Sequence, residues 1–270
     1  MDRLAMEFIS TFGMPPVEHI ELVASLGLSH TGMGPAPIVV LEPGLYPEWS
    51  MRGNPSLVRK VKAALAANGV SVSVGEGFLV MPGLGAEMFA ADLDLMAELG
   101  AGCINVCCVA PDFDSNLEGF ARLAEMAGER GLDITVEYLP GMAIGTLPMA
   151  RQLVEQSGRA NAGLLLDSMH LYRSGATADD AAALPKGMVK YAQLCDVPVV
   201  SKFAEYADEA RFERLAPGDG ELPLAEYVAA LPADVIVGLE IPMRALAEQG
   251  VGPAERLAPA VAKSRALLGG

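Results

Sequence analysis

The chain has 270 residues, of which 51% are hydrophobic and 20% charged; this composition excludes a disordered protein and allows one large domain. It carries 34 acidic against 19 basic residues, a net charge of −15 that argues against nucleic acids and anionic membrane surfaces as partners. No apolar stretch is long enough to span a membrane, and the first residues lack the basic and apolar regions of a signal peptide. We therefore expect a cytoplasmic protein acting on a small-molecule substrate, and a homo-oligomer is compatible with these features.

Short apolar runs typical of buried strands alternate with amphipathic helical patterns along the chain. In chain order, strands are expected at 4–11, 37–42, 70–75, 101–109, 132–139, 162–167, 190–196 and 235–240. Helical patterns lie between them at 16–27, 54–69, 86–100, 116–131 and 147–158, and many of these end in glycine, a common helix stop. Strands of this kind alternating with helices indicate a parallel sheet. About eight such units favour an α/β protein with a (β/α)8 TIM barrel, a single domain over 1–270, because the GxGxxG signature of an open Rossmann sheet is missing after the first strand.

The four cysteines give no sign of a disulfide framework. Three of them, Cys103, Cys107 and Cys108, crowd one apolar segment without CxxC spacing. We expect reduced thiols in the core.

Residues able to bind a hard cation lie at or near the ends of four consecutive predicted strands: Glu137, Asp167, Gln193 and Glu240. In a barrel of this kind, functional residues lie where strands end and βα loops begin. Three carboxylates and one amide oxygen form a site suited to Mg²⁺ or Mn²⁺, with Co²⁺ also compatible. Without a metal, such carboxylates repel each other and their pKa values rise. Helix capping or pairing with a base explains a single strand-end acid better than it explains the whole set.

Further candidates lie in the loops of the same barrel end. His170, three residues after Asp167, is expected to hold a substrate oxygen or to orient Asp167, whereas structural roles are favoured for His19 and His30. Arg211, Glu76 and Trp49 are candidates for substrate binding. Arg214 is expected to pair on the surface with neighbouring acids, and Arg173 to lock its loop.

The segments TVEYLP, DSMH, QLCD, APGDGELPL and GLEIP, spread over about 132–242, resemble the sugar phosphate isomerase/epimerase superfamily with its xylose isomerase-like TIM barrel. The resemblance implies that Glu137, Asp167, Gln193 and Glu240 bind one divalent metal, and that Glu137 and Glu240 also act as acid/base residues. Gln193 stands where the commoner pattern has a histidine, and glutamine occurs there in some relatives resembling 3-dehydroshikimate dehydratases. AP endonuclease IV shares the barrel but needs several histidines, and this chain has three in total.

The proposed site suits several reactions of a hydroxycarbonyl compound. A metal that chelates the carbonyl and a neighbouring hydroxyl lowers the pKa of the carbon-bound proton and stabilises the enediolate. Returning the proton to the adjacent carbon gives an isomerase, and returning it to the opposite face gives an epimerase. Expelling a β-hydroxyl gives a dehydratase. A metal-dependent isomerase or epimerase of a small sugar-like compound is the leading interpretation. The alternatives are a lyase of the dehydroshikimate dehydratase type and an inactive metal-binding partner subunit.

Overall fold

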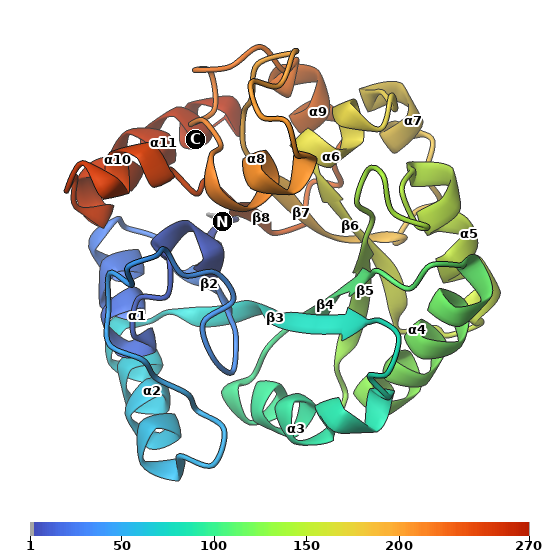
Figure 1. Cartoon of the computed structure of the whole chain (residues 1–270), viewed down its shortest axis with the longest axis horizontal. Coiled ribbons are helices and arrows are strands. Elements are labelled where there is room, and N and C mark those ends of the chain that lie inside the picture. Colours follow the sequence, from blue (N-terminus) through green and yellow to red (C-terminus); the bar gives the residue numbers. More distant parts are fainter. Residues whose placement is uncertain (1–2, 270) are drawn as a thin grey trace.

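The computed structural model describes residues 3–269 and shows eight parallel strands closed into a barrel (Figure 1). Each strand pairs with the next in the chain, and the last pairs with the first. The strands are β1 (Leu4–Met6), β2 (His30–Met33), β3 (Ser71–Val80), β4 (Cys103–Cys108), β5 (Asp133–Glu137), β6 (Ala162–Asp167), β7 (Val189–Leu194) and β8 (Val237–Leu239). The predicted TIM barrel is thereby confirmed.

Helices surround the barrel and cover the outward faces of the strands (Figure 1). They are α1 (Pro16–Ser25), α2 (Pro55–Asn68), α3 (Ala90–Leu99), α4 (Phe113–Gly128), α5 (Leu147–Ser157), α6 (Ser168–Arg173), α7 (Ala178–Ala182), α8 (Tyr206–Phe212), α9 (Leu224–Ala230), α10 (Arg244–Glu248) and α11 (Pro253–Leu267), with short 3-10 turns η1 (Phe8–Thr11) and η2 (Ala86–Phe89). The ends of α2 show why the sequence folds in this way. The Asn54 side chain accepts the Leu57 N–H at the start, and Gly69 takes the left-handed conformation at the end.

The second strand lies elsewhere than the sequence predicted. Residues 37–42 (PIVVLE) form no strand, and the barrel instead uses His30–Met33. Val39 and Leu41 from the predicted segment are nevertheless buried, because they pack in a small separate cluster with Ile9 and Phe12. The apolar run is therefore a core contribution of the long loop between β2 and α2, and not part of the sheet.

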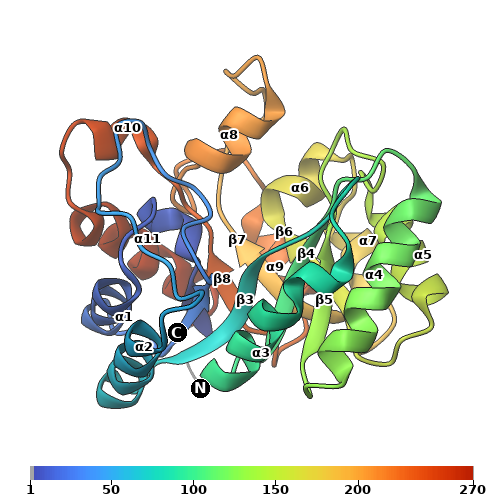
Figure 2. The same ribbon diagram turned by 60° about the horizontal axis from the view of Figure 1, so that its bottom comes forward.

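One end of the barrel carries the loops that follow the strands. Figure 2 shows α8 standing above this end of the barrel. We call this end the mouth; it is bounded by α8 and by the loop 34–54. The four cysteines are free thiols, as expected. Over residues 3–269, every helix is too short or too polar to cross a lipid bilayer.

Candidate active site

Strand register brings the four predicted ligand residues to the mouth. Asp167 on β6 lies beside Gln193 on β7, and Gln193 lies beside Gly238 on β8. Gly238 faces the barrel interior, because a Cβ atom built there would lie 1.5 Å from the Glu7 carboxylate. Gln193 and Asp167 share that inward direction, since paired residues of neighbouring strands point to the same face of a sheet. Glu240 follows two residues after Gly238, and Glu137 ends β5.

Arg214 lies between two of these carboxylates. Its Nη1 is 2.7 Å from Asp167 Oδ2 and 2.8 Å from Glu240 Oε2, and its side chain is 2% exposed. The expectation that Arg214 pairs with acids on the surface was therefore wrong. Glu209, one of the acids expected as its partner, instead binds Arg173. The prediction failed because the Arg214 side chain, two residues beyond the end of α8, points inward. There its Nε donates to the Ala210 carbonyl at 2.8 Å.

Glu137 and His170 form a second polar pair. The distance between His170 Nε2 and Glu137 Oε1 is 3.1 Å, and the Asn105 amide donates to Glu137 Oε2 at 2.6 Å. On the other side of the ring, His170 Nδ1 contacts the hydroxyl of Tyr206 from α8. The histidine is buried, and its backbone N–H donates to Asp167 Oδ1 at 2.9 Å, so Asp167 caps α6. An acid and an imidazole in contact, each held by further partners, have the geometry of an acid–base pair.

The carboxylates at the mouth differ in their affinity for protons. Burial opposes the charge of Asp167, but Arg214 and His170 outweigh it and hold the pKa of Asp167 below its usual range. Burial raises the pKa of Glu240 well above its usual range; Arg214 opposes this rise, whereas Glu137 and Asp167 add to it. The Arg214 guanidinium is shared between two acids, and it hydrogen-bonds Asp167. Its ion pair with Glu240, at 2.8 Å, therefore does not offset the effect of burial on the pKa of Glu240.

The donor atoms fit a hard cation, although each acid already has a protein partner. Gln193 Oε1 is buried and accepts no hydrogen bond, which is costly for an acceptor unless a ligand completes it. Together with the carboxylates, it makes a set of oxygen donors in a region with excess negative charge. Within residues 3–269, no three His, Cys, Asp or Glu side chains are grouped closely enough to hold a metal by themselves. A cation at this place would draw on Gln193 as well, and it would meet Arg214 already paired with Asp167 and Glu240.

A second pair of acids lies deeper in the barrel. Glu7, directly after β1, accepts the Tyr191 hydroxyl at 2.7 Å, and Glu76 on β3 accepts the Phe8 N–H at 3.1 Å. Both carboxylates lie against Gly32, where a Cβ atom would be 2.1 Å from Glu76 Oε1 and 2.6 Å from Glu7 Oε2. Burial and Glu76 raise the pKa of Glu7 well above its usual range, and burial, with Glu240 adding, raises that of Glu76 to about 7. Both acids therefore bind protons more tightly than a solvent-exposed glutamate does.

Besides His170, three residues were predicted to bind substrate: Glu76 lies inside the barrel, and Trp49 and Arg211 lie further out. The Trp49 indole N–H donates to the Gly13 carbonyl at 2.9 Å, and its ring packs edge-on against Phe8, 5.5 Å away. Trp49 therefore fixes the loop 34–54 beside β1. Arg211 is exposed, and its guanidinium carbon lies 5.7 Å from the centre of the Phe212 ring.

Arg173 and the two remaining histidines take structural positions, as the sequence indicated. The Arg173 guanidinium donates to the Pro198 carbonyl at 2.8 Å and pairs with Glu209 on α8 at 3.0 Å, which locks the loop. His19 is buried between Thr11 and Thr31, and burial lowers its pKa to about 3. His30 contacts the Ser71 hydroxyl at 2.8 Å.

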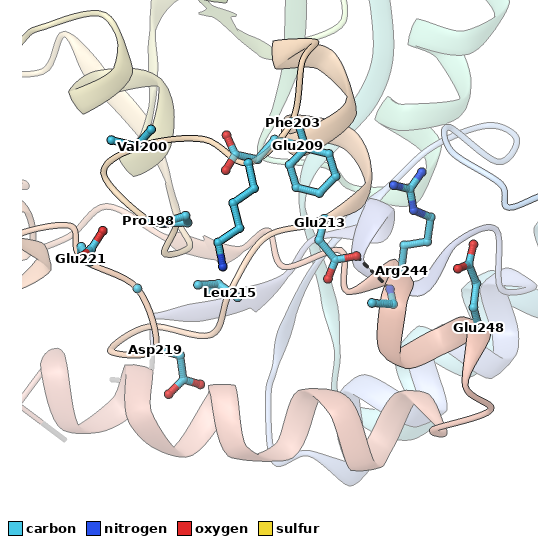
Figure 3. A pocket seen from close by; sticks show the side chains of 13 residues that line it. Pro198, Val200, Phe203, Glu209, Glu213, Leu215, Asp219, Glu221, Arg244 and Glu248 are labelled. Carbon is cyan, nitrogen blue, oxygen red and sulfur yellow. Dashed lines mark hydrogen bonds between the residues drawn. The ribbon is translucent and has the colours of Figure 1, made fainter.

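A cavity of about 890 Å³ lies outside the barrel, between the loop after β7 and α10. Figure 3 shows Glu213, Arg244 and Glu248 among the side chains that line it, with Glu213 accepting the Ala245 N–H at 2.8 Å. None of the four predicted metal ligands lines this cavity. It is separated from them by the segment that carries Arg214, because Glu213 and Leu215 form part of its wall.

Sequence reasoning missed four residues at the site: Glu7, Asn105, Tyr206 and Arg214. Glu7 left a signal, since it is the single charged residue of the run LAMEFIST. Arg214 left another, since it lies two residues before the start of the APGDG run at 216–220. Asn105 and Tyr206 left none, because their roles depend on contacts across strands and helices that sequence spacing does not reveal.

The xylose isomerase-like TIM barrel family model matches residues 20–265. The chain belongs to this family. A 3-dehydroshikimate dehydratase of Pseudomonas aeruginosa is 31% identical over 194 residues, which cover 67% of this chain and 30% of that protein. An inosose dehydratase of Geobacillus thermodenitrificans is 26% identical over 211 residues, covering 64% of this chain and 68% of the relative. The match to the dehydroshikimate dehydratase thus spans less than a third of that protein's length.

Solved structures share the fold at low identity. An IolI protein with a bound zinc atom superposes with a TM-score of 0.78 at 14% identity, covering 99% of this chain and 98% of that one. A D-psicose 3-epimerase has a TM-score of 0.73 at 16% identity, with 100% of both chains covered. The sequence relatives named above are dehydratases, and an epimerase shares the fold.

Proposed function

We propose that this protein is a metal-dependent dehydratase that removes water from a small β-hydroxycarbonyl compound. One observation carries the proposal: the acid–base pair Glu137 and His170 lies directly beside hard oxygen donors at the mouth. The His170 ring contacts Glu137, and the His170 backbone N–H binds Asp167. The choice of dehydration over isomerisation rests on the curated relatives, which are dehydratases, and on Gln193 at the seventh strand.

A divalent cation held by Glu137, Asp167, Gln193 and Glu240 would supply Lewis-acid polarisation of the substrate carbonyl. Mg²⁺ and Mn²⁺ suit these oxygen ligands best. The bound zinc of the IolI protein supports a divalent ion in a barrel of this fold. The chain's own contribution is to position the ligands and to move the proton.

Glu137 is the base in this proposal. It accepts the proton from the carbon next to the carbonyl, the electron pair of that C–H bond forms the new C=C bond, and the C–O bond to the β-hydroxyl breaks. His170, 3.1 Å from Glu137 Oε1, passes a proton to the departing hydroxyl, which leaves as water. Asn105 and Tyr206 hold the two residues in this orientation. No redox partner is required.

An epimerase is the second candidate, supported by the fold shared with D-psicose 3-epimerase. Its first step is the same proton removal by Glu137. The reaction then diverges, because Glu240 on β8 would return a proton to the opposite face of the same carbon. The two candidates therefore differ after the first step: the dehydratase loses the β-hydroxyl, whereas the epimerase keeps it and regains a proton from Glu240.

The deciding experiment is a screen of 3-dehydroshikimate, inososes, keto-acids and keto-sugars with Mg²⁺, Mn²⁺ or Co²⁺, run in D₂O. A dehydratase produces a conjugated compound that absorbs in the near ultraviolet. Deuterium incorporation with an inverted centre and no conjugated product would instead establish the epimerase. Full activity after exhaustive EDTA treatment would overturn the metal dependence in both cases.

A further inference from the structure

Arg214 is the buried cation closest to the predicted metal ligands, and its contacts define what it does there. Nη1 lies between Asp167 Oδ2 and Glu240 Oε2, at 2.7 and 2.8 Å, and also contacts Cys195 Sγ at 3.4 Å. A single nitrogen therefore bridges the two carboxylates. A metal ion coordinated by both Asp167 and Glu240 would have to take these same oxygens.

The charge balance of the mouth explains why a guanidinium lies there. Glu137, Asp167 and Glu240 are all buried, and Arg214 is the one arginine or lysine that contacts any of them in the described part of the chain. Leaving such acids without a positive partner is unfavourable in a region of low dielectric constant. Arg214 thus supplies, within the chain, part of the positive charge that a divalent cation would supply.

We propose that Arg214 competes with the divalent cation for Asp167 and Glu240, and stabilises the site while no cation is bound. This inference rests on the proposed metal dependence. Binding of the cation would displace the guanidinium from at least one of the two carboxylates. The released group would stay at the mouth, because Nε remains attached to the Ala210 carbonyl on α8.

The position of Arg214 in the chain is compatible with such a displacement. Arg214 directly follows the seven-residue helix α8 and the residue Glu213, and the cavity of about 890 Å³ lies on the other side of this segment. Glu213 and Leu215 line that cavity, as Figure 3 shows. The segment therefore has free volume on its outer side, into which its backbone can shift, although Arg214 itself does not line the cavity.

The test compares metal affinity and metal-free stability in Arg214→Met with those of the wild-type protein. Methionine keeps an unbranched apolar chain but removes the charge. Titration calorimetry with Mn²⁺ should show about 10- to 100-fold tighter binding by the variant, because a competing and repelling cation is gone. Its metal-free melting temperature should fall, and the rise on adding Mn²⁺ should exceed that of the wild type.

Arg173→Met is the matched control, since Arg173 also pairs with a buried acid, Glu209, but contacts none of the predicted ligands. Its Mn²⁺ affinity should equal that of the wild type. Equal or weaker Mn²⁺ binding by Arg214→Met would overturn the inference. Failure of the wild type itself to bind Mn²⁺, Mg²⁺ or Co²⁺ would instead refute the metal site, and with it the proposed function.

A second measurement does not depend on the folding of a variant. Crystals of the wild-type protein grown with EDTA and with Mn²⁺ should differ at Arg214. With metal present, we expect Nη1 to lie more than about 4 Å from Asp167 or from Glu240, beyond ion-pair contact. A bound Mn²⁺ with both contacts retained would show that the two cations do not compete.

Discussion

His170 connects two carboxylates that come from adjacent strands: its ring nitrogen Nε2 lies 3.1 Å from Glu137 Oε1, and its backbone N–H binds Asp167 Oδ1 at 2.9 Å. The first contact needs the side chain and the second does not. Replacing the side chain therefore separates proton transfer from the positioning of Asp167.

For this reason we expect His170→Ala to lose turnover while retaining most of its metal. The loss should be about 10²- to 10⁴-fold, the usual contribution of a general acid or base. Metal content of the purified variant and its kcat are the two measurements. If metal and activity fell in proportion, His170 would be a ligand and the assignment would fail.

Glu137→Gln and Glu240→Gln test the two acid/base candidates. Glutamine keeps an oxygen ligand and a similar volume but cannot accept the proton. Metal affinity should weaken modestly in both variants. In a dehydratase that uses Glu137 as its base, solvent deuterium exchange should vanish in Glu137→Gln and persist in Glu240→Gln. Partial exchange in each variant would indicate two bases and an epimerase, and near-normal turnover in both would move the role to another group.

Gln193→Leu should have opposite effects on stability and on metal binding. The substitution removes a buried oxygen that accepts no hydrogen bond, so the metal-free protein should gain up to about 1–3 kcal/mol in free energy of unfolding. Mn²⁺ affinity should drop because a ligand is lost. Gln193→His serves as the control, since histidine can replace the ligand and should shift preference toward Zn²⁺. Unchanged Mn²⁺ affinity in Gln193→Leu would remove Gln193 from the site.

The buried pair Glu7 and Glu76 should make the metal-free protein less stable as the pH rises. The pKa of Glu76 is about 7 in the folded protein, against an ordinary 4.5, so the folded state binds more protons between these values. The stabilisation is complete below pH 4.5 and is lost by pH 7 and above. Glu76→Gln cannot ionise and should recover up to about 3 kcal/mol at pH 8.

Urea unfolding in EDTA at pH 5 and at pH 8 measures this effect. Glu98→Gln is the control, because Glu98 is half exposed and pairs only with Lys62 on the surface. Its pH dependence should match that of the wild type. A Glu76→Gln variant whose stability fell with pH as steeply as the wild type would show that Glu76 does not hold a proton in the fold.

The sequence located seven of the eight strands, because buried β-branched and aliphatic runs are a strong signal. It failed at β2, whose residues His30–Met33 (HTGM) include a histidine and a glycine and lack a β-branched aliphatic residue. Strand β2 is buried because it lies between β1 and β3 in the barrel. The apolar run at 37–42 is buried because its loop packs against Ile9 and Phe12. Apolar content alone does not distinguish these two kinds of burial.

The candidate ligands at strand ends were predictable, whereas the direction in which the arginines after β7 point was not. Parallel strands deliver their last residues to one end, so strand order is enough to bring Glu137, Asp167, Gln193 and Glu240 to the mouth. Arg211 and Arg214 lie three residues apart near the end of α8, yet one points to solvent and the other into the barrel. That choice depends on the orientation of a short helix, which local sequence does not determine.

Gly32 and Gly238 give the barrel interior a recess whose walls are main chain. The carboxylates of Glu7 and Glu76 occupy the volume that side chains at these two positions would fill. A wall of this kind has no rotamers, so thermal motion of side chains cannot narrow or widen it. The recess is as rigid as the hydrogen-bonded strands themselves, and the acids inside it are held at a fixed depth below the mouth.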